Sequence, residues 1–100
     1  KQTWNGIDEE TAAFDHFYVY PNPVKDETTV GYKVLKNCDV KIDVLDVNGQ
    51  VVYKSFEGTR QSGDYKEVID FGKQQFANGT YMVRLNCGGL VKYRKVVKVD

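Results

Sequence analysis

The sequence predicts an all-β domain, an antiparallel β-sandwich of about seven strands, with a small barrel as the alternative. Side chains that favour a pleated surface (Val, Ile, Tyr, Phe, Trp and Thr) account for 37 of the 100 residues, whereas Ala, Leu, Met, Glu and Gln account for 18. Strand-like runs start near residues 16, 28, 38, 50, 64, 79 and 90. No segment sustains a 3.6-residue period, so the pattern favours strands throughout.

Residues 1–15 have the character of a linker, and the domain is expected to occupy residues 16–100. The linker has isolated apolar residues, no alternating run and four acids, which are Asp8, Glu9, Glu10 and Asp15. The aromatic run 16–20 gives the first strand. Pro21 and Pro23 end this strand, because a proline has no N–H to donate to a sheet ladder.

Alternation in the next two runs, 28–35 and 38–47, assigns one face of each strand to the core. The positions predicted to face inward are Val30, Tyr32, Val34, Cys38, Val40, Ile42 and Val44, and those predicted to face outward are Asp39, Lys41 and Asp43. Asn48-Gly49 separates the second run from the one that follows. This dipeptide predicts a hairpin with a type I′ turn, which needs two positive φ values.

The second half of the chain gives four further strands and a second tight hairpin. A polar loop is predicted over 58–63, and a longer connection over 72–78 carries Phe76, which is expected to fill the core. Gly88-Gly89 predicts a two-residue turn between the last two strands. The positions predicted to face inward are Ile69, Phe71, Tyr81, Val83, Leu85, Cys87, Val91, Tyr93, Val97 and Val99.

The composition argues against several classes of protein. Fourteen basic residues balance fourteen acidic ones, which argues against a nucleic-acid binder, since such domains carry a clustered excess of cations. No run of about 18 apolar residues exists, so no transmembrane segment is expected. The pattern of a signal peptide is also missing from these 100 residues.

The two cysteines leave two interpretations open. Cys38 begins one predicted strand and Cys87 ends another, both on inward positions. If these strands lie antiparallel, the cysteines meet, and a disulfide that closes a loop of about 50 residues would stabilise the fold by roughly 4 kcal/mol. Such a bond would place maturation outside the cytoplasm. Two buried free thiols are the alternative.

No catalytic, metal or cofactor site is predicted. His16 is the single histidine, and the sequence has no GxSxG, HExxH or glycine-rich phosphate-binding motif. The segment 43–49 loosely resembles a calcium loop but lacks the twelve-residue spacing and the terminal glutamate. Asn78-Gly79-Thr80 matches a glycosylation sequon, but a turn into the sixth strand is the simpler interpretation. We therefore expect a non-enzymatic domain.

The last predicted strand is strongly basic. It holds Lys92, Arg94, Lys95 and Lys98, with no acid before Asp100. Two interpretations remain for these cations. They protect an edge strand from pairing with other chains, or they form a strip that a partner recognises.

Four fragments stand out by their order and spacing along the chain. They are Tyr20-Pro21-Asn22-Pro23, the hairpin segment 40–52 with Asp46 and Gly49, the segment 76–85 with Gly79 and Tyr81, and the terminal segment 95–99. Taken together, they resemble the C-terminal sorting domain of the type IX secretion system. The resemblance covers residues 18–99. The cysteine pair is not part of the family pattern, and Asp100 lies one residue beyond it.

The resemblance implies an immunoglobulin-like sandwich behind a secreted cargo protein, which the outer-membrane translocon recognises as a folded signal. The recognised terminal strand would comprise Lys92, Arg94, Lys95, Val96, Val97 and Lys98. After passage through the periplasm, a sortase would cut within residues 1–17, for example before Gly6, Thr11 or Ala12. The cargo would then be released or attached to the cell surface.

The residues alone also leave a different function open, that of an immunoglobulin-like accessory or adhesion module that binds carbohydrate or protein. Seven tyrosines and Trp4 motivate this alternative, since aromatic faces stack on sugars. Most of the tyrosines, however, fall on positions predicted to face the core.

Overall fold

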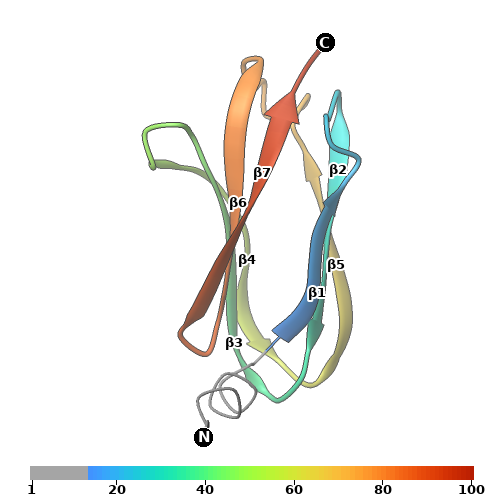
Figure 1. Cartoon of the computed structure of the whole chain (residues 1–100), viewed down its shortest axis with the longest axis vertical. Coiled ribbons are helices and arrows are strands. Elements are labelled where there is room, and N and C mark those ends of the chain that lie inside the picture. Colours follow the sequence, from blue (N-terminus) through green and yellow to red (C-terminus); the bar gives the residue numbers. More distant parts are fainter. Residues whose placement is uncertain (1–13) are drawn as a thin grey trace, which may run out of the picture.

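The computed structural model describes residues 14–100, which form two antiparallel β-sheets that face one another (Figure 1). The strands are β1 (Phe14–Tyr20), β2 (Glu27–Val34), β3 (Cys38–Leu45), β4 (Val51–Arg60), β5 (Gly63–Asp70), β6 (Gly79–Cys87) and β7 (Leu90–Lys98). One sheet has the order β1-β2-β5, and the other has the order β4-β3-β6-β7. The predicted sandwich is confirmed, and the described residues contain no helix.

The core lies between the two sheets and uses most of the inward positions that alternation predicted. Its fully buried side chains include Val30, Val34, Val40, Ile42, Val44, Ile69, Phe71, Val83, Leu85 and Val96. Phe76 closes one end of this core. Its ring lies 5.0 Å from the ring of Phe71 and 5.2 Å from that of Tyr81, which gives the core filler that the sequence predicted in this connection.

Two strands are longer than the alternation of apolar residues indicated. β1 begins at Phe14, which is buried, so Phe14 and Asp15 belong to the sandwich although their sequence context resembles a linker. β4 continues to Arg60 across the first half of the predicted polar loop 58–63, because Thr59 and Arg60 pair with Asp39 and Cys38. Ladder pairing with a neighbouring strand extends an edge strand even where its side chains are polar.

The β3–β4 hairpin forms at Asn48-Gly49, but its turn is not type I′. The N–H of Gly49 donates to the carbonyl of Asp46 at 3.0 Å, and the N–H of Asp46 donates to the carbonyl of Gln50 at 2.9 Å. Gly49 has φ of +82°, whereas Asn48 is not among the residues with positive φ. A three-residue connection of this kind needs only one left-handed position, so the type I′ prediction is wrong.

The β6–β7 hairpin has the predicted two-residue turn. Gly88 and Gly89 have φ values of +62° and +92°, and the flanking residues Cys87 and Leu90 pair with each other. Both central positions of a type I′ turn need positive φ, and glycine adopts it without the steric cost that a Cβ brings.

The middle of β3 is covered on both faces, which corrects the outward assignment of Asp43. Asp43 is only 2% exposed, and its Oδ2 accepts a hydrogen bond of 2.7 Å from the guanidinium of Arg84 on β6. Leu45, on the same face, is also buried. β3 is a central strand, so side chains from β4 and β6 can cover a short residue such as Asp43 where an edge residue would stay exposed.

The inward phase predicted for β7 is also wrong. Val96 and Lys98 are buried, whereas Val91 is 37% exposed and Tyr93 is 47% exposed. Val91 and Tyr93 therefore lie on the outer face of the sheet. On the inner face, the side chain of Arg94 reaches over the ring of Phe17 on β1. A charged side chain thus lies on the face that the alternation assigned to Val91, Tyr93, Val97 and Val99.

Candidate recognition surface

β7 is an edge strand, and its exposed cations form the most distinctive charged surface that the sequence predicted. It pairs with β6 on one side through an unbroken register from Cys87–Leu90 to Gly79–Lys98. No other named strand forms a ladder with it among residues 14–100. Lys92, Arg94 and Lys95 are all exposed, and β7 contains no acid.

Lys92 and Arg94 point from β7 toward β1, the edge strand of the opposite sheet. The Nε of Arg94 donates to the carbonyl of Phe17 at 3.0 Å, and its guanidinium carbon lies 4.8 Å from the centre of the Phe17 ring. The ammonium of Lys92 lies 6.0 Å from the ring centre of Phe14. These cations cover the open side of the core while their charges remain accessible to solvent.

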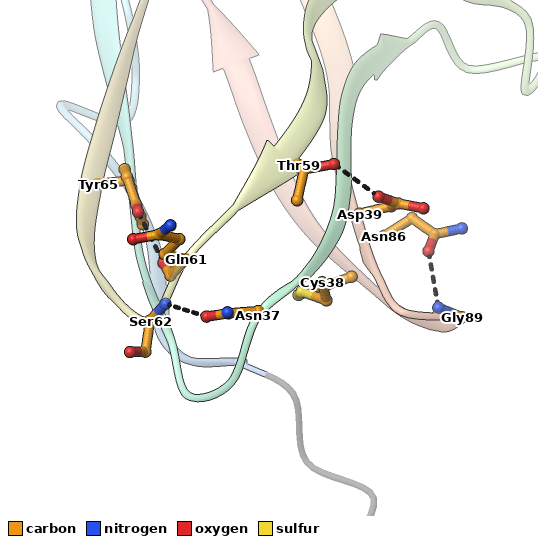
Figure 2. The surroundings of a disulfide bond; sticks show 10 residues. Asn37, Cys38, Asp39, Thr59, Gln61, Ser62, Tyr65, Asn86 and Gly89 are labelled. Carbon is orange, nitrogen blue, oxygen red and sulfur yellow. Dashed lines mark hydrogen bonds between the residues drawn. A yellow bond between two sulfur atoms is a disulfide. The ribbon is translucent and has the colours of Figure 1, made fainter.

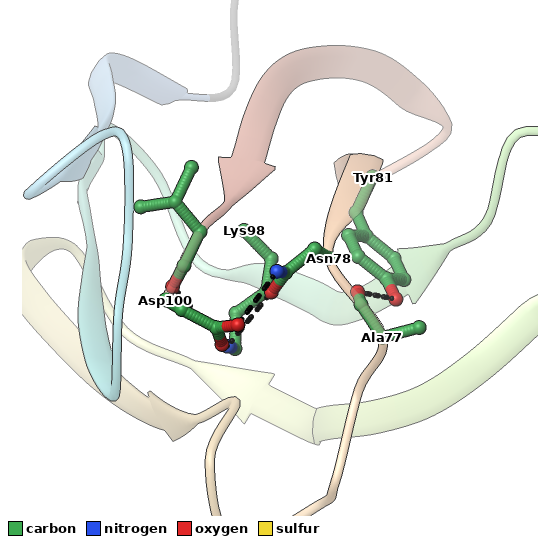
Figure 3. Close-up of polar contacts among 6 residues, drawn as sticks. Ala77, Asn78, Tyr81, Lys98 and Asp100 are labelled. Atoms are coloured by element: carbon green, nitrogen blue, oxygen red, sulfur yellow. Dashed lines mark hydrogen bonds and ion pairs between the residues drawn. The ribbon is translucent and has the colours of Figure 1, made fainter.

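Lys98 differs from the other three cations because its side chain is buried. Its ammonium donates to the Oδ1 of Asn78 at 3.4 Å and to the carbonyl of Val99 at 3.3 Å (Figure 3). The carboxylate of Asp100 lies 3.8 Å from the same ammonium and accepts a 3.0 Å hydrogen bond from Asn78. Lys98 therefore anchors the end of β7 to the segment before β6.

The six residues predicted for recognition thus divide into two groups. Lys92, Arg94 and Lys95 are accessible, whereas Val96 and Lys98 are buried and Val97 is half-buried. The second group holds the strand in place.

The Pro21-Asn22-Pro23 motif lies against the outer edge of β7. The side-chain amide of Asn22 donates to the carbonyl of Lys95 at 2.8 Å, and its Oδ1 accepts the N–H of Val97 at 3.0 Å. The backbone of Val24 continues the contact: its N–H donates to the carbonyl of Val97 at 2.8 Å, and its carbonyl accepts the N–H of Val99 at 2.9 Å. We call residues 22–24 the clasp. Sequence reasoning missed this contact, because more than 70 residues separate the partners.

The other motif residues stabilise turns and the core. The Oδ1 of Asp46 accepts the N–H groups of Asn48 at 2.9 Å and Gln50 at 3.0 Å, which fixes the β3–β4 turn. Gly79 has φ of +148° where the chain enters β6. The hydroxyl of Tyr81 donates to the carbonyl of Ala77 at 2.6 Å, while its ring packs in the core.

A disulfide joins Cys38 at the start of β3 to Cys87 at the end of β6, with the Cα atoms 6.1 Å apart (Figure 2). It therefore links two neighbouring strands of the same sheet. The N–H of Gly88 donates to the carbonyl of Asp39 at 3.0 Å beside it. Together these bonds fix the turn end of the β6–β7 hairpin to the start of β3.

A polar cluster connects the two sheets at Tyr32, Arg60 and Glu67. The hydroxyl of Tyr32 donates to the Oε2 of Glu67 at 3.3 Å, and Arg60 forms an ion pair with the same oxygen. The guanidinium of Arg60 also lies over the rings of Phe56 and Tyr65. Burial raises the pKa of Tyr32 to about 12. The cluster was not predicted, because β2, β4 and β5 bring its members together.

The remaining candidate residues are spread over the surface. His16 is exposed beside Asp15 in a bulge of β1, with φ of +54°.

No group of three or more His, Cys, Asp or Glu residues that could hold a metal ion occurs within residues 14–100. In the same part of the chain, no helix is long and apolar enough to cross a membrane. Of the tyrosines, Tyr18, Tyr20 and Tyr93 are the exposed ones.

The fold and this surface define a small β-sandwich domain that presents a cationic edge strand. A scan against protein-family models matches residues 18–99 to the secretion system C-terminal sorting domain. The chain belongs to this family and carries a sorting signal of type IX secretion, which implies interaction with that machinery and export across the outer membrane. Sorting domains of this family are in general not catalytic. A search of curated proteins found no match.

Proposed function

We propose that the type IX translocon reads this domain through the exposed cations of β7, namely Lys92, Arg94 and Lys95. The observation that carries this proposal is their common position on an edge strand that contains no acid. Val96, Val97 and Lys98 contribute by holding the strand: the first is fully buried, the second bonds to the clasp, and the third bonds to Asn78. A rigid strand presents its charges in one arrangement, which favours specific recognition.

We also propose the order of the segments in the exported protein, which is cargo, linker and sorting domain. The cargo precedes the linker, which the sequence predicted over residues 1–15 and of which Phe14 and Asp15 belong to β1. The rest of the chain acts as the sorting domain. We place the sortase cut before Phe14, because a cut there would leave every described strand intact. The candidate bonds before Gly6, Thr11 and Ala12 lie outside the described residues. The cargo then reaches the cell surface, where it is attached or released.

An export assay tests the role of the cations. The 100-residue chain is fused behind a periplasm-targeted reporter in a host with a type IX system, and reporter activity is measured in the medium, on the cell surface and in the periplasm. The test variant is Lys92→Glu/Lys95→Glu. The matched control, Lys33→Glu/Lys66→Glu, changes the net charge equally at exposed positions of the other sheet.

We expect the wild-type and control fusions to be exported and the test variant to lose at least tenfold in export. Deletion of residues 95–100 should abolish export, because it removes the buried anchors Val96 and Lys98. Retention of the wild-type fusion in the periplasm would contradict the sorting function of this chain. Equal export of both charge variants would contradict only the role of the cations.

A further inference from the structure

The four edge strands of the sandwich differ in how well they could pair with another chain. β1 has a register shift at its bulge between Asp15 and Tyr18, and β4 has two register shifts against β3. Bulges of this kind disrupt the row of backbone groups that an incoming strand would need. β5 and β7 keep an unbroken register with their neighbours, so they are the two regular edges.

The clasp shows which backbone groups of β7 face outward. It bonds to the carbonyl of Lys95, to both backbone groups of Val97 and to the N–H of Val99. The N–H and C=O of one strand residue point to the same side, and this side alternates along the strand. The backbone groups of Val91 and Tyr93 therefore also face outward, away from β6.

These groups remain open to a partner strand. Within residues 14–100, no strand ladder or turn hydrogen bond uses the outward N–H groups of Val91, Tyr93 and Lys95 or the carbonyl of Val91. The carbonyl of Tyr93 accepts a 3.0 Å hydrogen bond from the guanidinium of Arg94 on its own strand. The clasp thus covers the edge from Lys95 to Val99 and leaves the half before it uncovered.

Side chains on the two faces of this uncovered half define the chemistry of a partner. Lys92 and Arg94 lie on the face toward β1, and Val91 and Tyr93 lie on the outer face, where both are more than a third exposed. A strand that pairs here places alternate side chains beside each face. Acidic side chains suit the first face, and apolar or aromatic side chains suit the second. The β5 edge carries both Asp64 and Lys66 as exposed residues, so it has no such single-sign preference.

We propose that the export machinery binds this domain by strand addition, through an extended segment with alternating acidic and apolar residues that pairs with β7 at residues 91–95. This proposal rests on the function proposed above and adds its geometry: main-chain pairing provides the contact, and the clasp sets its limit at Lys95. If the machinery recognised only the charged side chains of β7, it would not need the outward N–H groups.

Proline substitution separates these two modes in the export assay. Tyr93→Pro removes an outward N–H and leaves the bonds to β6, because edge strands accept proline where the N–H faces solvent. Tyr93→Thr is the matched control, since it removes the ring but keeps the N–H. Formation of the Cys38–Cys87 disulfide, followed by thiol alkylation, reports folding of each fusion.

We expect Tyr93→Pro to reduce export at least tenfold with the disulfide formed, and Tyr93→Thr to remain within about threefold of wild type. Export of a folded Tyr93→Pro fusion at the wild-type level would overturn strand addition, while wild-type export itself would still support the sorting function. Retention of the wild-type fusion would instead count against that function.

A second measurement does not depend on whether the proline variant folds. Amide hydrogen exchange of the wild-type chain is followed with and without the purified translocon in detergent. We expect the N–H groups of Val91, Tyr93 and Lys95 to exchange at least tenfold more slowly in the complex. Binding without any change at these three amides would contradict the proposal.

Discussion

The side chain of Asn22 and the backbone of Val97 form a hydrogen bond of 3.0 Å across 75 positions of the sequence. Through its second bond, to the carbonyl of Lys95, the same side chain replaces the main-chain groups of a neighbouring strand. The motif that follows β1 therefore supports the terminal strand directly. This contact gives a physical reason for an asparagine between two prolines in a sorting domain.

Loss of the Asn22 side chain should loosen the end of β7. Asn22→Ala removes one donor and one acceptor at an exposed site, so we expect the unfolding free energy to fall by roughly 1–2 kcal/mol. The amide of Val97 should also exchange faster. Asn48→Ala, at an exposed position in the β3–β4 turn, is the control. It should leave the exchange rate of the Val97 amide unchanged. An unchanged exchange rate at Val97 would show that the clasp is not needed.

Removal of the disulfide should cost more than loss of the clasp. The Cys38→Ala/Cys87→Ala variant frees a segment with a sequence separation of 49 residues, and we expect about 4 kcal/mol less stability from the loop-entropy model. Urea unfolding of the wild type with and without reductant provides the comparison. Equal urea midpoints with and without reductant would mean that the disulfide contributes nothing to the stability of the domain.

The Asp43–Arg84 pair should be sensitive to loss of one partner. Arg84→Met leaves the buried carboxylate without its ion pair, and Oδ1 of Asp43 already has no hydrogen-bond partner. Because Arg84 itself is partly exposed, we expect a loss at the lower end of the range for buried pairs, about 3 kcal/mol in unfolding free energy. The double variant Asp43→Leu/Arg84→Met should recover most of it, because no unpaired charge remains. A double variant no more stable than the single one would argue against this explanation.

The β3–β4 turn depends on the carboxylate of Asp46. Asp46→Ala removes the acceptor of two backbone N–H groups and should lower the unfolding free energy by about 1 kcal/mol. Asp46→Asn keeps an acceptor and should cost less. Thermal unfolding of the two variants tests this order, and a larger loss with Asn than with Ala would contradict it.

Alkaline pH should destabilise the domain through Tyr32. Its pKa is about 12 in the folded state against 10.0 for the unperturbed group, so the folded state favours the neutral phenol. This stabilisation is complete below pH 10 and disappears as the pH rises from 10 to 12, a change on the order of 2 kcal/mol. Unfolding free energies measured from pH 9 to 12 should show this decline. The Tyr32→Phe variant should lack the part of the decline that comes from ionisation of Tyr32. An identical decline in this variant would exclude Tyr32 as the cause.

Alternation of apolar residues predicted the inward positions of β3 and β6 well and those of β7 poorly. On β3 and β6 both neighbours are strands, so the inward positions Val40, Ile42, Val83 and Leu85 are buried as expected. The inner face of β7 meets β1, which is the edge strand of the other sheet. There Lys92 and Arg94 lie over the rings of Phe14 and Phe17. Valine and tyrosine then occupy the outer face, where the sequence pattern placed the core.

The sequence by itself determined the β-sandwich, its two glycine hairpins, the membership of a sorting family and the basic character of the last strand. These properties depend on local preferences and on the order of motifs along the chain. Only the tertiary structure decided which cations are accessible, that Asn22 covers part of the terminal edge, and that Tyr32 meets Arg60 and Glu67. Such contacts join residues far apart in sequence, and their geometry follows from the packing of the two sheets.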